Sequence, residues 1–293
     1  MEILFQVLEI VAPVFILASI GFGWVRLGLD FDLKFVTRIA MTLSVPCLIF
    51  VALAQAEVDP AALNVLVLAT LTTYLVVALV MLLVTLAFRL DLRTNLAPLI
   101  FGNTGNVGLP VALFAYGEPG LTLAVVVFAL MAILSFTIGV WIVSGGGSPL
   151  PALKEPMVGA TVLGGLCLYL DWTPPDWTMN AIGLIGQMGI PLMLITLGVA
   201  IARLQPGAIV KATVLSVFKL AACAAIPFAI ARAFALPPME TGVLVLQVAM
   251  PVAVTSYMLA EKYKAKAQDV AGLVVVSTLL SVFGLPVLLA LVI

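Results

Sequence analysis

Long apolar runs, separated by short clusters of charged residues, proline and glycine, follow one another along the whole chain. A run of about 20 apolar residues is the length of a helix that crosses a lipid bilayer. Division of the chain at its polar clusters predicts ten such helices and therefore an all-α polytopic membrane protein. The predicted spans cover residues 4–25, 36–55, 63–88, 95–116, 120–143, 156–171, 179–202, 209–234, 240–260 and 269–292.

The overall composition agrees with this interpretation and excludes several classes of protein. Of the 293 residues, 64% are hydrophobic and 9% are charged, whereas the surface of a soluble domain needs roughly a quarter charged residues. The net charge of −1 and the lack of a Lys/Arg-rich run exclude nucleic acid as a partner. The three Cys residues do not have the CxxC spacing of a metal or redox site, so we interpret them as small core residues. We expect no cofactor.

The distribution of positive charge predicts the orientation in the membrane. Lys and Arg residues are held back from translocation, so loops that contain them face the cytoplasm. Both termini are then expected on the outer side of the cell inner (plasma) membrane. Eleven of the 13 Lys and Arg residues fall in alternate loops: Arg26, Lys34, Arg38, Arg89, Arg93, Lys154, Arg203, Lys211, Lys262, Lys264 and Lys266.

The two halves of the chain are similar in sequence. LPVALFAY at 109–116 matches MPVAVTSY at 250–257, and Asn106 then falls opposite Gln247. Weaker matches follow in the same order, between Pro13 and Pro156, Pro46 and Pro191, Ala87 and Ala233, and Ser135 and Ser281. Because each half has an odd number of spans, we expect an inverted repeat of residues 1–143 and 156–293, joined by a cytoplasmic linker at 144–155.

One polar stretch, GNTGNVGLP at 102–110, lies inside the predicted fourth span. Irregular backbone is tolerated in a bilayer only where protein or a water-filled cavity satisfies its polar groups. Proline and glycine predict a broken helix here and again at Pro251, with half-helices that begin just after Pro110 and Pro251. Two helix N-termini near the midplane, each with a partial positive charge, are typical of an anion site, and a carboxylate suits it.

The alternative is that these residues serve only a kink or close helix packing. The C-terminal ends of the preceding half-helices, together with Asn103, Thr104 and Asn106, could also hold a cation or water. The candidate substrate-binding residues are Asn103, Thr104, Asn106, Gly108, Pro110, Gln247, Pro251 and Thr255.

The N-x-G-N-x-G-[LI]-P run in the fourth of ten spans, the second proline in the ninth, and the five-plus-five arrangement resemble the auxin efflux carrier family. That family includes prokaryotic members described as transporters of malonate or other carboxylates, and it belongs to the bile acid:sodium symporter-like superfamily.

The resemblance implies that spans 4 and 9 cross at their prolines. It also implies that spans 1, 2, 6 and 7 form a dimerising scaffold, while spans 3–5 and 8–10 carry substrate by an elevator movement. It places Asn103, Asn106, Gly108, Pro110, Gln247 and Pro251 at the crossing. The short central linker differs from the long hydrophilic loop of the plant members, which speaks against auxin itself and against control by phosphorylation.

Three polar residues lie inside predicted spans, away from the broken segments. Lys219 is about 12 Å from the cytoplasmic end of the eighth span, at the helical rise, which is too deep for its amine to reach the interface. We expect it either to attract the anion or to replace a bound cation; the alternative is a lysine capped by half-helix carbonyls without a role in transport. Glu9 is expected to be structural or interfacial, and Gln187 to hold helices together rather than to face the site.

The predicted mechanism is secondary transport of a small organic anion. The fourth, fifth, ninth and tenth spans have no Asp or Glu near their middle and the chain has no His, so a carboxylate relay for proton or sodium antiport is not indicated. Coupling through neutral oxygens and uniport both remain open. The chain has no Ser/His pair, G-x-G-D motif or P-loop, which argues against an enzyme. The sequence favours a monocarboxylate or an amphipathic acid over a dicarboxylate, and the alternative function is a passive anion channel or a ligand sensor.

Overall fold

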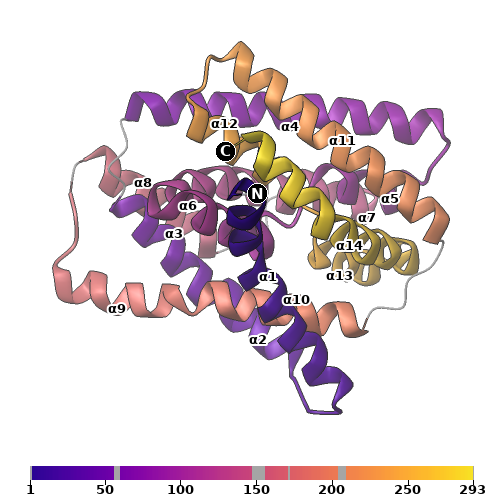
Figure 1. Ribbon diagram of the computed structural model, residues 1–293, viewed down its shortest axis with the longest axis horizontal. Coiled ribbons are helices and arrows are strands. Elements are labelled where there is room, and N and C mark those ends of the chain that lie inside the picture. Colours follow the sequence, from indigo (N-terminus) through magenta and orange to yellow (C-terminus); the bar gives the residue numbers. More distant parts are fainter. Residues whose placement is uncertain (1, 56–59, 147–155, 171, 204–208, 293) are drawn as a thin grey trace.

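The structure is a computed structural model that describes residues 2–55, 60–146, 156–170, 172–203 and 209–292 (Figure 1). The described chain is built from α-helices, joined by short loops and by three wider π-helical turns. The α-helices are α1 Glu2–Arg26, α2 Leu33–Ile39, α3 Val45–Ala54, α4 Pro60–Ala87, α5 Leu92–Ile100, α6 Leu109–Leu134, α7 Val140–Ser144, α8 Pro156–Tyr169, α9 Asp176–Gln187, α10 Gly189–Arg203, α11 Ile209–Ala233, α12 Pro238–Val248, α13 Val254–Lys262 and α14 Ala267–Val292. The π-helical turns are η1 Ala40–Ser44, η2 Thr104–Gly108 and η3 Ser135–Gly139.

Six helical runs of the described chain are long and apolar enough to cross a membrane, which supports a multi-pass membrane protein. They are Leu33–Ala54, Leu63–Ala87, Thr104–Ser144, Asp176–Arg203, Ile209–Ala233 and Ala267–Val292. The run Thr104–Ser144 joins the predicted fourth and fifth spans and bends at Gly117, where φ is 67°. Glycine adopts this left-handed conformation without the strain that a Cβ atom would cause. The number of spans and the inverted repeat stay predictions.

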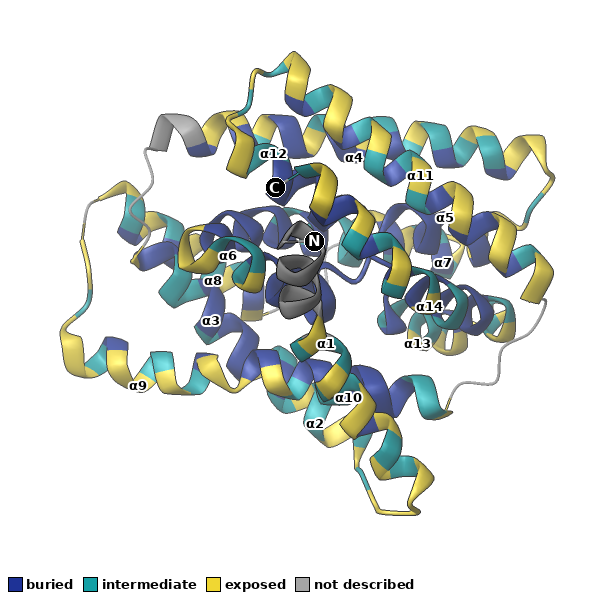
Figure 2. Cartoon of the chain, viewed as in Figure 1, coloured by how far each residue is buried: buried dark blue, intermediate teal, exposed yellow. Residues whose placement is uncertain are grey.

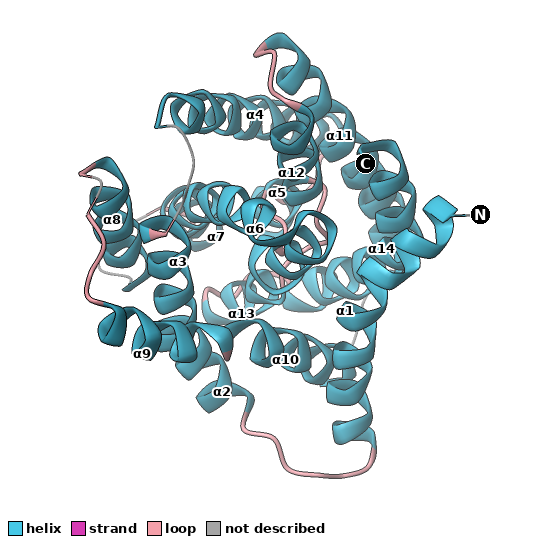
Figure 3. Cartoon of the chain, turned by 60° about the vertical axis from the view of Figure 1, so that its left-hand side comes forward, coloured by secondary structure: helices cyan, strands magenta, loops and turns pink. Residues whose placement is uncertain are grey.

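The helices form two groups. In the first, which we call the flanking group, α1 and α2 contact α10, and α3 contacts α8 and α9. In the second, the central group, α11 contacts α4, α12 and α14, while α4 contacts α5 and α12 contacts α6. Figure 1 shows α4 and α11 along the upper edge of the molecule and α9 and α10 along the lower edge, and Figure 3 shows the same separation from another side.

The flanking group is held by direct backbone contact between α1 and α10. A Cβ atom on Gly198 would lie 1.7 Å from the carbonyl oxygen of Ala18, and one on Gly21 would lie 2.0 Å from that of Ile195. Only glycine allows two helices to approach this closely. The two helices are therefore expected to move as one rigid unit.

Unbroken runs of buried residues lie on α6 at 120–129 and on α12 at 242–248, whereas the outer helices also present apolar side chains outward (Figure 2). Leu83 of α4 and Val210 of α11 are 66% and 80% exposed. Inside α4, threonine hydroxyls donate to the carbonyl four residues earlier, as Thr70 does to Leu66 at 2.7 Å. These bonds satisfy hydroxyl groups where no water is present.

Candidate functional site

Two broken helices meet near the centre of the molecule. The first break separates α5 from η2, and the second separates α12 from α13. Gly102 pairs with Val252 in an antiparallel bridge, and the backbone N–H of Asn103 donates to the carbonyl oxygen of Pro251 at 2.6 Å. A Cβ atom on Gly102 would lie 2.8 Å from the carbonyl oxygen of Met250, so this crossing requires glycine. The irregular segments expected in the fourth and ninth spans are therefore present and in contact.

The first break is not where the sequence predicted it. The helix begins at Thr104 and continues through Pro110, instead of beginning after that proline. The reason is local: the Asn103 side-chain oxygen Oδ1 accepts a hydrogen bond from the backbone N–H of Asn106 at 3.3 Å and caps the helix. Pro251 does lie inside the second break, and α13 begins at Val254 as predicted. The sequence match that paired Pro110 with Pro251 thus joins two positions with different structural roles.

Pro110 follows a widened turn rather than a break. Proline lacks an N–H, and in a regular helix its ring would press on the carbonyl four residues earlier, which belongs to Asn106. In η2 the backbone N–H groups instead donate to the carbonyl five residues earlier. Gly108 donates to Asn103 at 3.2 Å, and Leu109 donates to Thr104. Pro46 follows η1 at the same distance along the chain. Such turns occur frequently at functional sites.

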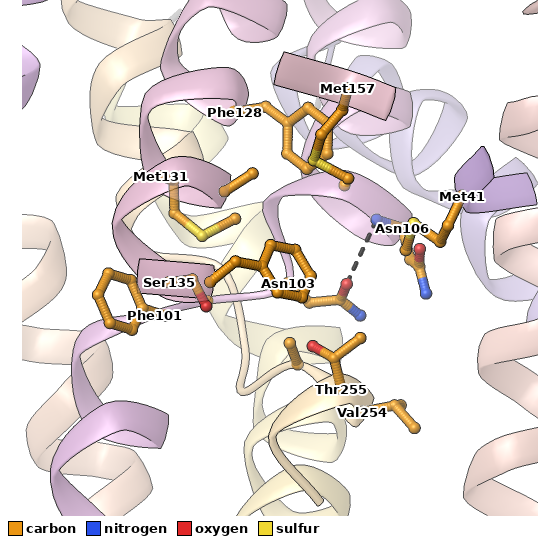
Figure 4. Close-up of a pocket in the computed structure, with 15 residues that line it drawn as sticks. Met41, Phe101, Asn103, Asn106, Phe128, Met131, Ser135, Met157, Val254 and Thr255 are labelled. Atoms are coloured by element: carbon orange, nitrogen blue, oxygen red, sulfur yellow. Dashed lines mark hydrogen bonds between the residues drawn. The ribbon is translucent and has the colours of Figure 1, made fainter. Parts of the chain in front are cut away.

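A small cavity lies beside the crossing, between the two groups of helices (Figure 4). Its volume is about 40 Å³, which is room for a few water molecules. All three π-helical turns contribute to its wall. The cavity is lined by Met41, Phe101, Gly102, Asn103, Gly105, Asn106, Phe128, Met131, Ala132, Ser135, Phe136, Met157, Ala253, Val254 and Thr255.

The lining of the cavity is mostly apolar, with a few uncharged polar side chains and no charged one. The first turns of η2 and α13 both border it, through Gly105 and Thr255. The first N–H groups of a helix have no partner within the helix and carry partial positive charge. The side-chain nitrogen Nδ2 of Asn103 is buried and has no hydrogen-bond partner among the described residues. The arrangement therefore offers N–H groups and no competing carboxylate.

Three of the predicted site residues, Asn103, Asn106 and Thr255, line this cavity; Thr104, Gly108, Pro110, Gln247 and Pro251 do not. Gln247 of α12 instead faces Gly108, where an added Cβ would lie 2.4 Å from its Oε1 atom. Gln247 is fully buried, and neither its Oε1 nor its Nε2 has a partner in the described part of the chain. It therefore packs η2 against α12 in this structure.

Two of the three polar residues outside the broken segments, Lys219 and Gln187, do not line the cavity. Lys219 is 2% exposed, and its Nζ donates to the carbonyl oxygen of Leu99 at 3.1 Å, at the end of α5. Gln187 is exposed at the end of α9, so it does not face the site. The side chain of Glu9 lies outside the described residues.

The sequence analysis did not identify the walls of the cavity. Met41 and Met157 reach it from the flanking group, and Phe128, Met131 and Phe136 come from the helical run of the central group. Apolar side chains inside apolar spans carry no signal of their own. Ser135, a polar residue in the middle of the predicted fifth span, was the one available signal.

Comparison with known proteins identifies a family of membrane transporters. A family model described as "Membrane transport protein" matches residues 6–150 and again residues 146–289. An uncharacterized transporter of Methanocaldococcus jannaschii is 24% identical over 195 residues, which is 62% of this chain. The match likewise spans about 62% of the length of that relative. Since the two family matches together cover nearly the whole sequence, the chain belongs to the membrane transport protein family, which is the auxin efflux carrier family.

Proposed function

We propose that this protein is a secondary transporter of small organic carboxylates, which it binds in the cavity between the first turns of η2 and α13. The observation that carries the proposal is the convergence of two helix N-termini on a cavity without a charged side chain. Helix N-termini bind anions through free N–H groups and the helix dipole. Membership of a transporter family supports movement of the bound anion across the membrane.

The lining favours an acid with one carboxylate and an apolar body. Asn103, Asn106, Ser135 and Thr255 supply the polar side chains of the lining, while methionine and phenylalanine supply its large apolar side chains. A second carboxylate would have to be buried against these apolar groups without a cation, which is strongly unfavourable. Methionine side chains adapt to varied apolar shapes, so a range of related acids is expected to bind.

The cavity is too small for the proposed substrate, so binding must be accompanied by a structural change. A carboxylate with any apolar body needs more room than a few waters, so either the methionine side chains or the two helix groups must separate. The close contact of α1 with α10 suits a fixed scaffold, against which the central group would slide in an elevator movement. We propose further that the protein is a homodimer in the inner membrane, with both termini outside and with two inverted five-helix repeats.

The decisive experiment records currents from proteoliposomes on a solid-supported membrane. A panel of acetate, benzoate, phenylacetate and malonate is presented with and without sodium and a pH gradient. Wild-type protein is expected to give a saturable current of anion sign with the monocarboxylates. Asn106→Ala removes a polar group from the cavity and should abolish it. Gln187→Ala, which removes an amide from an exposed position, should leave it unchanged.

The same recordings address the alternative function. A current that does not saturate, and no exchange of labelled acid against unlabelled acid, would indicate a passive channel. If wild-type protein bound the acids without current or exchange, it would be a sensor. Equal loss of current in both variants would contradict a site at Asn106.

A further inference from the structure

Lys219 is a buried cation that the proposed binding site does not use. It is among the largest fully buried side chains, at 2% exposure, and lies in α11 beside α5 and α12. Its Nζ donates to the carbonyl oxygen of Leu99 at 3.1 Å and lies 3.8 Å from Cys223 Sγ. The ion pair found among the described residues joins Lys211 to Asp269, so no described carboxylate neutralises Lys219. A lone cation at this depth requires a physical reason.

The end of α5 provides that reason. The last carbonyls of a helix have no partner within the helix and carry partial negative charge. The N–H of Phe101 closes the final turn on Ala97 at 2.9 Å, whereas the carbonyl of Leu99 receives the Lys219 amine. In an apolar core a nearby cation strongly stabilises such a helix end. The crossing begins at Gly102, two residues after Ile100, the last residue of α5.

Two buried hydroxyl groups, one on the helix of Lys219 and one beside the break, have no partner among the described residues. Ser216, three residues before Lys219 on α11, has a buried hydroxyl with no partner among the described residues, and so has Tyr74 of the adjacent helix α4. The ring of Tyr74 stacks on Phe101, the first residue of the break, with ring centroids 6.1 Å apart. Loss of the lysine amine would therefore leave a buried region with several oxygen atoms and no positive charge.

We propose that Lys219 is a positioning residue that acts as a built-in cation of the crossing. Its amine takes the place at the end of α5 that a free monovalent cation would otherwise fill, and it thereby holds the Phe101–Asn103 break in the shape that brings Asn103 to the cavity. The consequence for transport rests on the proposed function: the wild-type protein needs no monovalent cation to bind its anion. A variant that lacks the amine but has space for an ion acquires such a requirement.

The test compares Lys219→Ala, which opens space, with Lys219→Met, which removes the charge but fills the space. Lys211→Met is the matched control, because it removes a lysine from the partly exposed end of the same helix. Hydrogen exchange of the amides of residues 99–106 is measured by mass spectrometry in choline chloride, sodium chloride and ammonium chloride. This measurement requires no knowledge of the substrate.

We expect both Lys219 variants to exchange at the break about tenfold faster than wild type in choline, because a hydrogen bond to a charged group is lost. Ammonium or sodium should slow exchange in Lys219→Ala by about threefold or more but have no effect on Lys219→Met. Wild type and Lys211→Met should exchange alike in all three salts. Amides of α14 serve as the reference for global unfolding.

Unchanged exchange in the two Lys219 variants would overturn the proposal, and so would fast exchange in Lys219→Ala that neither ammonium nor sodium slows. If Lys219→Ala folded only with ammonium or sodium present, the proposal would be supported; failure to fold in every salt would contradict it. A wild-type protein that transports no carboxylate but passes the exchange test would contradict the proposed function alone.

Discussion

Gly108 of η2 and Gln247 of α12 lie in such close contact that a methyl group on Gly108 would be 2.4 Å from Gln247 Oε1. Because Gln247 is fully buried, its side chain has little room to withdraw. The contact fixes the distance between the widened turn that carries Asn106 and the helix that leads into the second break. Gln247 therefore influences the geometry of the cavity although it does not line the cavity.

Gly108→Ala is therefore expected to destabilise the protein by about 1–3 kcal/mol, the usual range for overpacking a core. Substrate affinity should fall as well, because η2 must shift. Thermal unfolding and current titrations in proteoliposomes measure the two effects. Gln247→Ala in the same chain should restore much of the stability. If the double variant were as unstable as the sum of the single variants, the contact would not be the cause.

Asn103 caps η2 and also lines the cavity, and two substitutions separate these roles. Asn103→Ala removes the acceptor for the Asn106 N–H and should lower stability by about 1 kcal/mol. Asn103→Asp keeps an acceptor oxygen but places a negative charge at the proposed anion site. We expect Asn103→Asp to keep most of the cap and to lose the carboxylate current. Normal current in Asn103→Asp would exclude an anion next to this residue.

Pro110→Ala tests whether the proline maintains the widened turn. With an N–H restored at 110, the helix can return to regular bonds, which rotates Asn106 away from its present direction. Substrate affinity should fall about tenfold, a change of about 1.4 kcal/mol, while the unfolding temperature stays close to that of wild type. Pro286→Ala, which changes a proline within α14, is the control and should leave affinity unchanged. Equal affinity in wild type and Pro110→Ala would show that the turn widens without the proline.

Gly198→Ala tests the rigid contact between α1 and α10. The added Cβ would lie 1.7 Å from the carbonyl oxygen of Ala18, so the two helices must separate and stability should fall by about 3 kcal/mol. Gly23→Ala on α1 is the matched control, because no atom lies within 4 Å of the added Cβ. The unfolding temperature should decrease for Gly198→Ala and stay the same or rise for Gly23→Ala. A similar temperature for both variants would refute a fixed contact.

The sequence predicted the helical class and the two broken segments because both leave strong local signals. Apolar runs bounded by charge mark helices, and GNTGNVGLP marks an interruption. The position of the first break was wrong, because proline was taken as the breaking residue. In the structure the Asn103 cap sets the start of the helix, and Pro110 acts on the turn that follows.

The walls of the cavity could not be predicted from the sequence. Met41 and Met157 are brought to the cavity by packing between helices far apart in the chain. For Lys219, the sequence indicated its depth and, as one alternative, capping by half-helix carbonyls, but it did not identify Leu99 at the end of α5 as the partner. Such partners depend on helix rotation and crossing angle, for which no local pattern exists.

The bond from the N–H of Asn103 to the carbonyl of Pro251 also bears on biogenesis. During synthesis the first break enters the bilayer well before Pro251 has left the ribosome. Until then, the Asn103 amide has to be satisfied by water, lipid headgroups or the insertion machinery. Insertion of the first half is thus expected to remain incomplete until the second half arrives, and a nascent chain stalled between the two breaks should be especially sensitive to proteolysis and quality control.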